Sequence, residues 1–350
     1  MNDRTIACVM EQTLGNITHY LNLRRHEDAL AGFAPRWLPV EYSAGPIARV
    51  PWTVTGGLAA RRALKPHLKD VDGVFIHTTT LALLNADNFR RKPTVLSTDG
   101  TPMNKRHMRG DYGLKSESSA QEKGKRLLYR QLFGQARGFV GWSNWAKQSF
   151  VEDYGCRDED VVVIPPGIDL DQFVVPERKN ELPRILFVGG DFERKGGDLL
   201  LNVFRRGLLG KAELDLVTRS NIAPERGVRV YNDVAPNSDA LLKLYRDADI
   251  FVLPTRADCF SLVCMEALAS GLPVVTTRVG GIPDMLEEGK TGHVLDVDDA
   301  DALADVLTEL AENPGRRREM GLLGRQAAET RFDARQNARA LFEFVRSRCC

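Results

Sequence analysis

Short runs of apolar and mostly β-branched residues recur along the chain, separated by longer segments of helical composition. Within these runs polar and apolar positions do not alternate, which is typical of strands buried on both faces of a sheet. Helical segments between such strands indicate βαβ units and therefore parallel sheets. The predicted strands are residues 6–9, 74–76, 94–97, 138–141, 161–165, 185–188, 214–217, 228–231, 250–253 and 274–276. The hydrophobic pattern thus predicts an α/β protein.

The strands are numerous enough for two sheets, and the sequence between them contains a boundary. A Pro-Pro-Gly run at 165–167 ends one predicted strand, and a charged connector at 176–180 precedes the next. This organisation predicts two Rossmann-like lobes whose parallel sheets face a cleft. Open α/β sheets bind ligands at the carboxyl ends of their strands, so we expect the ligands in this cleft. We expect a first lobe at 1–175, a second lobe at 176–332, and a C-terminal helix at 333–350 that packs back across the linker.

Composition narrows the class of protein. The formal net charge of +1 provides no global field that would attract nucleic acid. No apolar run approaches the roughly 20 residues that span a bilayer, and the polar start of the chain does not resemble a signal peptide. We therefore expect a cytoplasmic protein. The cysteines form no CxxC pair and have no matching histidine cluster, so we expect no metal site.

The strongest candidate site follows the predicted strand at 250–253. Asp258 precedes a predicted helix that begins near Ser261, and Glu266 lies inside that helix. The unpaired backbone N–H groups at the start of a helix favour an anion such as a diphosphate. Two carboxylates in this arrangement can accept hydrogen bonds from separate hydroxyl groups of one ligand. The alternative is that Asp258 only caps the N-terminus of the helix and that Glu266 is an ordinary helical glutamate without a function. The predicted anion-binding residues at the helix start are Phe260, Ser261, Leu262 and Val263.

A second candidate follows the predicted strand at 185–188. Gly189 and Gly190 end this strand, and Arg194 and Lys195 precede the next helix. Cations beside a diphosphate leaving group stabilise its charge without a metal ion. The alternative is a pair of solvated loop charges. The glycine spacing does not fit the dinucleotide fingerprint G-x-G-x-x-G.

The run from Asp258 to Glu266 resembles the E-x7-E signature of the retaining GT-B glycosyltransferases of family 4. The segments that follow it, Gly280-Gly281 and the Gly-Lys-Thr-Gly run at 289–292, are similar to the family as well. The resemblance implies that Asp258 contacts the transferred sugar and that Glu266 contacts the nucleotide ribose. It also implies a nucleoside diphosphate sugar as donor, retention at the anomeric carbon, and no further cofactor.

Three departures from the family pattern stand out. Asp258 is one methylene shorter than the usual glutamate, and Ser261 stands where glycine is usual. Lys195 matches the family lysine that stabilises the leaving diphosphate, whereas Gly190 occupies the position of the usual arginine. Arg194 is therefore only a displaced candidate for that arginine.

The first half of the chain is expected to hold the acceptor. Gly15 lies in a loop that opens a predicted helix, and there it would let the backbone approach the donor phosphate or the acceptor. His77 ends one predicted strand and Asp99 follows another, at the strand ends where α/β sheets bind ligands. The resemblance to the family implies that a side chain near here contacts the transferred sugar. The alternatives are an ordinary buried histidine and an aspartate that caps a turn.

Residues 103–137 carry more basic than acidic side chains, and the later part of the segment has an apolar stripe. A basic amphipathic segment can lie on an anionic membrane surface, although a solvated helix face explains the same pattern. The sequence as a whole predicts transfer of a sugar from a nucleoside diphosphate to a hydroxyl of a glycan, lipid or small molecule. The alternatives are a sugar-nucleotide epimerase of the same fold and a degenerate, non-catalytic binding protein.

Overall fold

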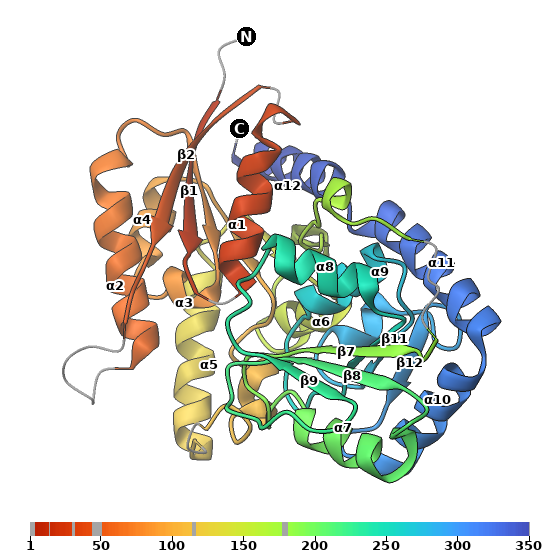
Figure 1. Cartoon of the computed structure of the whole chain (residues 1–350). Coiled ribbons are helices and arrows are strands. Elements are labelled where there is room, and N and C mark those ends of the chain that lie inside the picture. The colour runs from red at the N-terminus through yellow and green to blue at the C-terminus, as the bar shows by residue number, and fades with distance from the viewer. Residues whose placement is uncertain are drawn as a thin grey trace. The chain divides into compact units, whose positions relative to one another are not determined.

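The computed structural model describes residues 4–13, 15–29, 32–43, 51–113, 117–176 and 181–349 (Figure 1). The chain forms two compact units. The first comprises residues 1–107, 115–167 and 334–350, and the second comprises 108–114 and 168–333. Residues 168–175, which we expected in the first lobe, thus belong to the second unit. Most of the predicted connector, residues 177–180, lies outside the described residues.

The first unit is built on a parallel six-stranded sheet in the order β2-β1-β3-β4-β5-β6. Its strands are β1 (Arg4–Glu11), β2 (Phe33–Val40), β3 (Gly73–His77), β4 (Thr94–Thr98), β5 (Gly138–Gly141) and β6 (Val161–Val163). Its helices are α1 (Gly15–Arg25), α2 (Trp52–Leu64), α3 (Thr79–Ala82), α4 (Ala86–Arg91), α5 (Ser119–Phe133), α6 (Asn144–Glu152) and α12 (Ala334–Cys349).

Helices cover both faces of this sheet, which explains why its strands are apolar on both sides (Figure 1). On one face, β-strand residues such as Ile6 and Phe75 pack against α1 and α12. The C-terminal helix contributes Leu341, Phe342 and Val345 to this layer. The opposite face packs against helices α2 to α6. The C-terminal helix is therefore part of the first unit, although the chain reaches it only after completing the second.

The second unit has its own parallel six-stranded sheet, in the order β12-β11-β10-β7-β8-β9. Its strands are β7 (Arg184–Val188), β8 (Glu213–Val217), β9 (Val228–Tyr231), β10 (Ile250–Leu253), β11 (Val274–Thr277) and β12 (Gly292–Leu295). Its α-helices are α7 (Gly197–Val203), α8 (Asp239–Asp247), α9 (Leu262–Ala269), α10 (Ala300–Glu312) and α11 (Pro314–Arg331). A single π-turn, Phe204–Leu208, extends α7.

The α/β class, the two parallel sheets and all ten predicted strands are confirmed. One strand is shorter than expected: β6 ends at Val163, because Pro165 and Pro166 have no N–H to continue the ladder. Two edge strands were missed, β2 and β12. Strand β2 contains Pro35 and Pro39, which a strand tolerates at a sheet edge.

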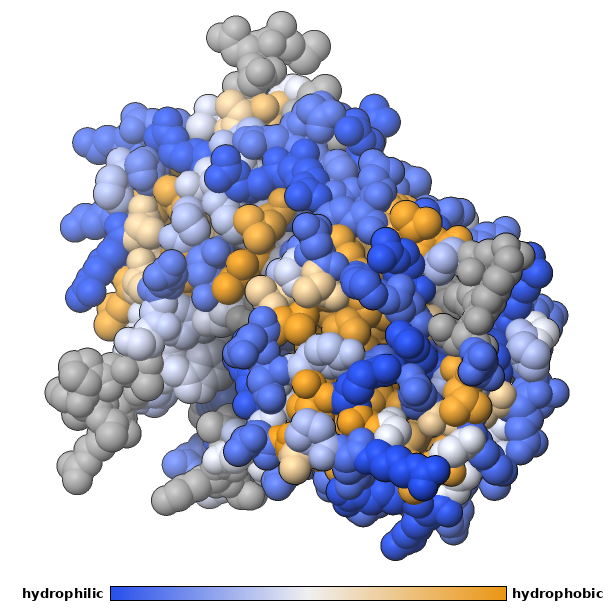
Figure 2. Space-filling model, viewed as in Figure 1, coloured by the Kyte–Doolittle hydropathy of each residue, from blue (hydrophilic) through white to orange (hydrophobic). Residues whose placement is uncertain are grey.

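The surface is mostly hydrophilic on the face shown in Figure 2, and hydrophobic side chains gather over α1. Ile17 and Leu21 lie one turn apart on that helix and are 40% and 49% exposed. Within the described parts of the chain, no helix combines the length and the apolar character needed to cross a bilayer.

Candidate functional site

The turn after β7 folds tightly because it contains glycines. A Cβ atom on Gly189 would lie 2.9 Å from Cβ of Lys195 and 2.7 Å from the ring of Phe187. Gly196 has a φ of +75°, and a Cβ there would lie 1.9 Å from the carbonyl oxygen of Pro254. The turn therefore lies directly against the end of β10, and only glycine permits this approach.

This approach brings the predicted cation and the predicted acid together. Lys195 Nζ donates a hydrogen bond to Oδ2 of Asp258, and the two side chains are 14% and 13% exposed. Charges this far from water are costly unless they are paired, so each group stabilises the position of the other. The ion pair joins the turn after β7 to the loop that leads into α9.

Arg194 reaches the same loop but is held by other partners. Its Nη1 donates to the carbonyl oxygen of Ala257 at 2.7 Å, and its Nε donates to Asp191 Oδ2 at 3.0 Å. The guanidinium thus fixes the residue next to Asp258. The structure brings Arg194, Lys195 and Asp258 close together, with Arg194 contacting backbone rather than the Asp258 carboxylate.

Further contacts position the loop from the other side. Arg256 forms a bidentate pair with Asp198 at 2.7 and 3.0 Å, which ties the loop to the first turn of α7. Its Nε also donates to Asp298 at 2.8 Å. A Cβ on Gly280 would lie 2.1 Å from the carbonyl oxygen of Asp258. This glycine of the family pattern therefore serves close packing of the loop.

Helix α9 begins where the sequence predicted. Ser261 is the N-cap residue, and Leu262 and Val263 form the first turn, so their N–H groups lie before the intrahelical ladder. The Ser261 hydroxyl does not cap the helix, and its buried oxygen has no partner among the described atoms other than a weak interaction with the Cys264 thiol. Phe260 is buried beside it. A buried hydroxyl so weakly partnered at a helix N-terminus suits a ligand oxygen.

Glu266 is buried in α9 and 6% exposed. The hydroxyl of Tyr245, on α8, donates to its Oε2 at 2.8 Å. Burial raises the pKa of the Glu266 carboxyl, and the hydrogen bond from Tyr245 acts in the opposite direction. The sequence predicted Glu266 but missed Tyr245, because a tyrosine inside an amphipathic helix is indistinguishable from core.

In the first unit, the candidate site residues His77 and Asp99 lie at the carboxyl ends of β3 and β4. The Nε2 of His77 donates to Oδ1 of Asn16 at 3.0 Å, near the start of α1 at Gly15. Burial, followed by the charge of Lys105, lowers the pKa of His77 to about 3. Asp99 forms an ion pair with Lys105 at 2.9 Å. His77 is therefore a neutral group, and Asp99 is held by a cation.

A buried carboxylate at the end of β1 was missed. Glu11 accepts hydrogen bonds from Thr13 at 2.5 Å and from the Tyr42 hydroxyl at 2.6 Å. The hydroxyl of Thr78 donates to its other oxygen, and Thr78 has an unusual φ of +92°. An acidic residue that ends an apolar strand was the available signal. Glu11 holds the loops after β1 and β3 in fixed positions.

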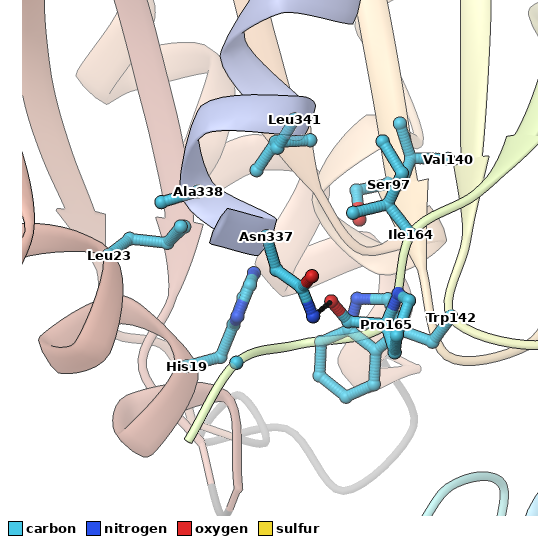
Figure 3. A pocket seen from close by; sticks show the side chains of 11 residues that line it. His19, Leu23, Ser97, Val140, Trp142, Ile164, Pro165, Asn337, Ala338 and Leu341 are labelled. Carbon is cyan, nitrogen blue, oxygen red and sulfur yellow. Dashed lines mark hydrogen bonds between the residues drawn. The ribbon is translucent and has the colours of Figure 1, made fainter. Parts of the chain in front are cut away.

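A small pocket lies between α1, α12 and the end of β6 (Figure 3). In Figure 3 His19, Asn337 and Trp142 lie around it, and the Asn337 amide donates to the carbonyl oxygen of Pro165 at 3.2 Å. Its volume is about 10 Å³, whereas ligand pockets measure roughly 300–1,000 Å³. The pocket therefore cannot hold a substrate.

Comparison with known proteins agrees with this geometry. Residues 10–172 match the family model described as Glycosyltransferase Family 4, and residues 182–313 match the model described as Glycosyl transferases group 1. A D-inositol 3-phosphate glycosyltransferase from Corynebacterium aurimucosum is 30% identical over 234 residues, which is 59% of this chain and 56% of that protein. The chain thus spans little more than half the length of the curated relatives it matches.

Solved structures share the fold over the whole chain. Sucrose-phosphate synthase from Thermosynechococcus elongatus has a TM-score of 0.75 at 19% identity, covering 98% of both chains. Anabaena HepE in complex with UDP and glucose has a TM-score of 0.72 at 15% identity, covering 98% of this chain and 100% of that one. With both halves matched by family models and both sheets in place, the chain belongs to the GT-B glycosyltransferases of the family 4 type.

Proposed function

We propose that this protein transfers a sugar from a nucleoside diphosphate sugar to a hydroxyl acceptor, and that the donor binds at the carboxyl edge of the second sheet. The observation that carries the proposal is the ion pair between Lys195 and Asp258 directly before α9. The pair brings a cation and a carboxylate next to the start of a helix. That helix start carries the buried Ser261 hydroxyl, whose one recorded interaction among the described atoms is a weak one with the Cys264 thiol. The sheet edge where these groups meet is the one at which parallel α/β sheets bind ligands.

In this proposal the diphosphate lies at the start of α9. The N–H groups of the first turn and the Ser261 hydroxyl donate to its oxygens. Lys195 supplies positive charge as the bond to the sugar breaks, so that negative charge on the leaving group is stabilised by a preorganised cation. Asp258, released from part of its contact with Lys195, accepts hydrogen bonds from the sugar.

Glu266 would receive the ribose. Its Oε2 is held by Tyr245, so the carboxylate has a fixed orientation before the ligand arrives. A carboxylate can accept two hydroxyl donors in the geometry that a ribose diol presents. The burial that raises the pKa of Glu266 also strengthens such hydrogen bonds, since little water competes for them.

The family resemblance further supports transfer with retention and without a metal ion, and we include both in the proposal. Lys195, the helix start and Arg194 are the groups that would replace a metal as charge stabilisers. HepE, whose solved complexes contain UDP and glucose, makes a uridine donor the first to test. The acceptor is proposed to enter beside the carboxyl edge of the first sheet, near His77 and Asp99.

We also propose that α5 contacts an anionic membrane surface. Its exposed side includes Leu127 and Leu128, which are 53% and 48% exposed, together with the basic residues Lys123 and Arg130. Exposed leucines flanked by cations favour the boundary between headgroups and acyl chains. Flotation with vesicles containing phosphatidylglycerol tests this: binding should fall when Leu127 and Leu128 are replaced by serine. Equal flotation of both proteins contradicts it.

A thermal-shift screen against UDP-, GDP-, ADP- and TDP-sugars tests the donor site. A donor present at 100 times its dissociation constant should stabilise the protein by about 2.7 kcal/mol. The variant Glu266→Gln keeps an oxygen that can accept from Tyr245 but loses one acceptor position, so we expect it to lose the shift while remaining folded. Glu309→Gln, an exposed glutamate on α10, is the matched control.

A donor-dependent shift in wild type and in Glu309→Gln, but not in Glu266→Gln, supports the site and identifies the donor. An unchanged shift in Glu266→Gln refutes the assignment of Glu266. The absence of any shift with all four donors counts against the proposed function and favours a non-catalytic protein.

A further inference from the structure

An arginine distant in sequence lies beside the turn after β7. Strands β7 and β8 are parallel neighbours, with Val188 opposite Val217. The pairing continues one residue further, since the N–H of Gly189 donates to the carbonyl oxygen of Val217 at 2.9 Å. Two residues beyond each strand stand Gly190 and Arg219. The register therefore places these two residues at the same carboxyl edge of the sheet.

The side chain of Arg219 occupies the space beside Gly190. A Cβ atom on Gly190 would have Arg219 Nε at 3.6 Å and Arg219 Cδ at 3.7 Å as its nearest neighbours. The adjacent Gly189 lies against Lys195 in the same way. The two-glycine turn therefore has the Cβ of Lys195 against one residue and the side chain of Arg219 against the next, so both basic residues adjoin the turn after β7.

The ion pairs of this region distinguish Arg219 from the other cations. Lys195 is paired with Asp258, and Arg194 with Asp191. Arg256 is likewise paired with two aspartates. Arg219 is exposed and forms no ion pair with any residue that the structure describes. A nucleoside diphosphate arriving here would meet a lysine whose charge is already balanced by a carboxylate, and one arginine whose charge is not.

We propose that Arg219 binds the diphosphate of the donor and supplies the second cation of this site. The proposal rests on the proposed function. A planar guanidinium can donate two parallel hydrogen bonds to a phosphate, and it remains charged at all working pH values. In the family pattern an arginine at the position of Gly190 stabilises the diphosphate. Arg219 would perform this role in the present chain, which has glycine at position 190. At Gly190 the Arg219 side chain lies at van der Waals distance from the place of a Cβ atom, so it occupies the space into which a longer side chain at position 190 would extend.

The test compares nucleotide affinity and turnover in Arg219→Gln, Arg219→Lys and a control. Arg226→Gln is the matched control, because Arg226 is an exposed arginine of the same unit that precedes β9 and so lies at the opposite edge of the sheet. The probes are UDP and UMP, or the corresponding guanosine or adenosine pair if the donor screen selects another base. Affinity is measured by isothermal titration calorimetry, and turnover as release of nucleoside diphosphate from the selected donor.

We expect Arg219→Gln to weaken binding of the diphosphate about tenfold or more, which corresponds to 1.4 kcal/mol, and to weaken binding of the monophosphate less. Its kcat should fall more than its KM rises, because the charge on the leaving group is greatest in the transition state. Arg219→Lys should recover part of both losses. The melting temperature should not change, since Arg219 is exposed and loses no ion pair with the residues that the structure describes.

Unchanged diphosphate affinity and kcat in Arg219→Gln, with wild type binding the diphosphate, overturns the role of Arg219 and leaves the donor site intact. An equal loss in Arg226→Gln also overturns it, because a general effect of surface charge would then explain both. If wild type binds no nucleoside diphosphate at all, the proposed function fails and the role of Arg219 fails with it.

Discussion

The hydrogen bond between Tyr245 and Glu266 yields a prediction whose size follows from the structure. Tyr245→Phe removes only the hydroxyl that donates to Glu266 Oε2 at 2.8 Å. A hydrogen bond to a charged group contributes about 1.5–3 kcal/mol. Because the hydrogen bond from Tyr245 favours the charged carboxylate, losing this donor should raise the pKa of Glu266 further above its usual value.

The sign of the pH dependence can be worked out from the same carboxyl. Burial already raises the pKa of folded Glu266 above its unfolded value, so the folded protein is penalised once pH exceeds the unfolded pKa, and fully once it exceeds the folded pKa. In Tyr245→Phe this penalty is larger. The variant should therefore be less stable than wild type by about 1.5–3 kcal/mol at pH 8. The difference should shrink as the pH falls through the folded pKa of Glu266, because the protonated carboxyl no longer carries the penalty.

Urea unfolding at pH 5, 6.5 and 8 measures this difference in stability directly. As the pH is lowered, the variant should lose donor affinity at a higher pH than wild type, because its Glu266 is protonated earlier. Tyr231→Phe is the matched control, because it removes a tyrosine hydroxyl of the same unit that donates a long hydrogen bond of 3.4 Å to Asp215. A loss of stability that is equal at all three pH values refutes the reasoning, since it would show that the hydroxyl does not act through the charge of Glu266.

Three further predictions concern the tight turn, the buried histidines and the cations. Gly196→Ala should destabilise the protein by at least about 2 kcal/mol in thermal or urea unfolding, because the φ of Gly196 is +75° and the new Cβ would collide with Pro254. A variant as stable as wild type would contradict this turn geometry. Burial lowers the pKa of His77 to about 3 and lowers that of His19 well below its usual value. Below pH 6.5 the unfolded chain binds protons at these two histidines and the folded chain does not. The free energy of unfolding should therefore fall by about 1.4 kcal/mol per pH unit and per histidine as the pH drops below 6.5. Replacing both histidines with glutamine should flatten this dependence of stability on pH, and an unchanged slope would count against neutral histidines. Activity should survive a chelator such as EDTA, because cations of the chain stabilise the leaving group; strict dependence on Mg²⁺ or Mn²⁺ contradicts the electrostatic scheme.

The sequence predicted the parts of this molecule that local patterns encode. Buried parallel strands appear as short apolar runs, so all ten predicted strands were found. The predicted start of α9 near Ser261 is confirmed as well. The two strands that were missed lie at sheet edges, where burial is incomplete and prolines are tolerated.

What could not be predicted depends on contacts between distant segments. The run containing Asp258 and the turn containing Lys195 were each recognised, but their ion pair requires the packing of Gly196 against Pro254. Tyr245 and Glu11 were missed because their partners come from other elements. Arg219 reaches Gly190 only through the register of β7 and β8, which no local pattern reveals.

Release of nucleoside diphosphate from the donor identified by thermal shift tests the central claim most directly, with wild type compared to Lys195→Met. Lys243→Met, which removes an exposed lysine paired with Asp247 on α8, is the control. We predict release by wild type and by the control, and a loss of at least 100-fold in Lys195→Met, as when one preorganised charge contact is removed from an active site. Conversion of the donor to another sugar nucleotide without release would instead indicate an epimerase, and binding without either reaction would indicate a non-catalytic protein.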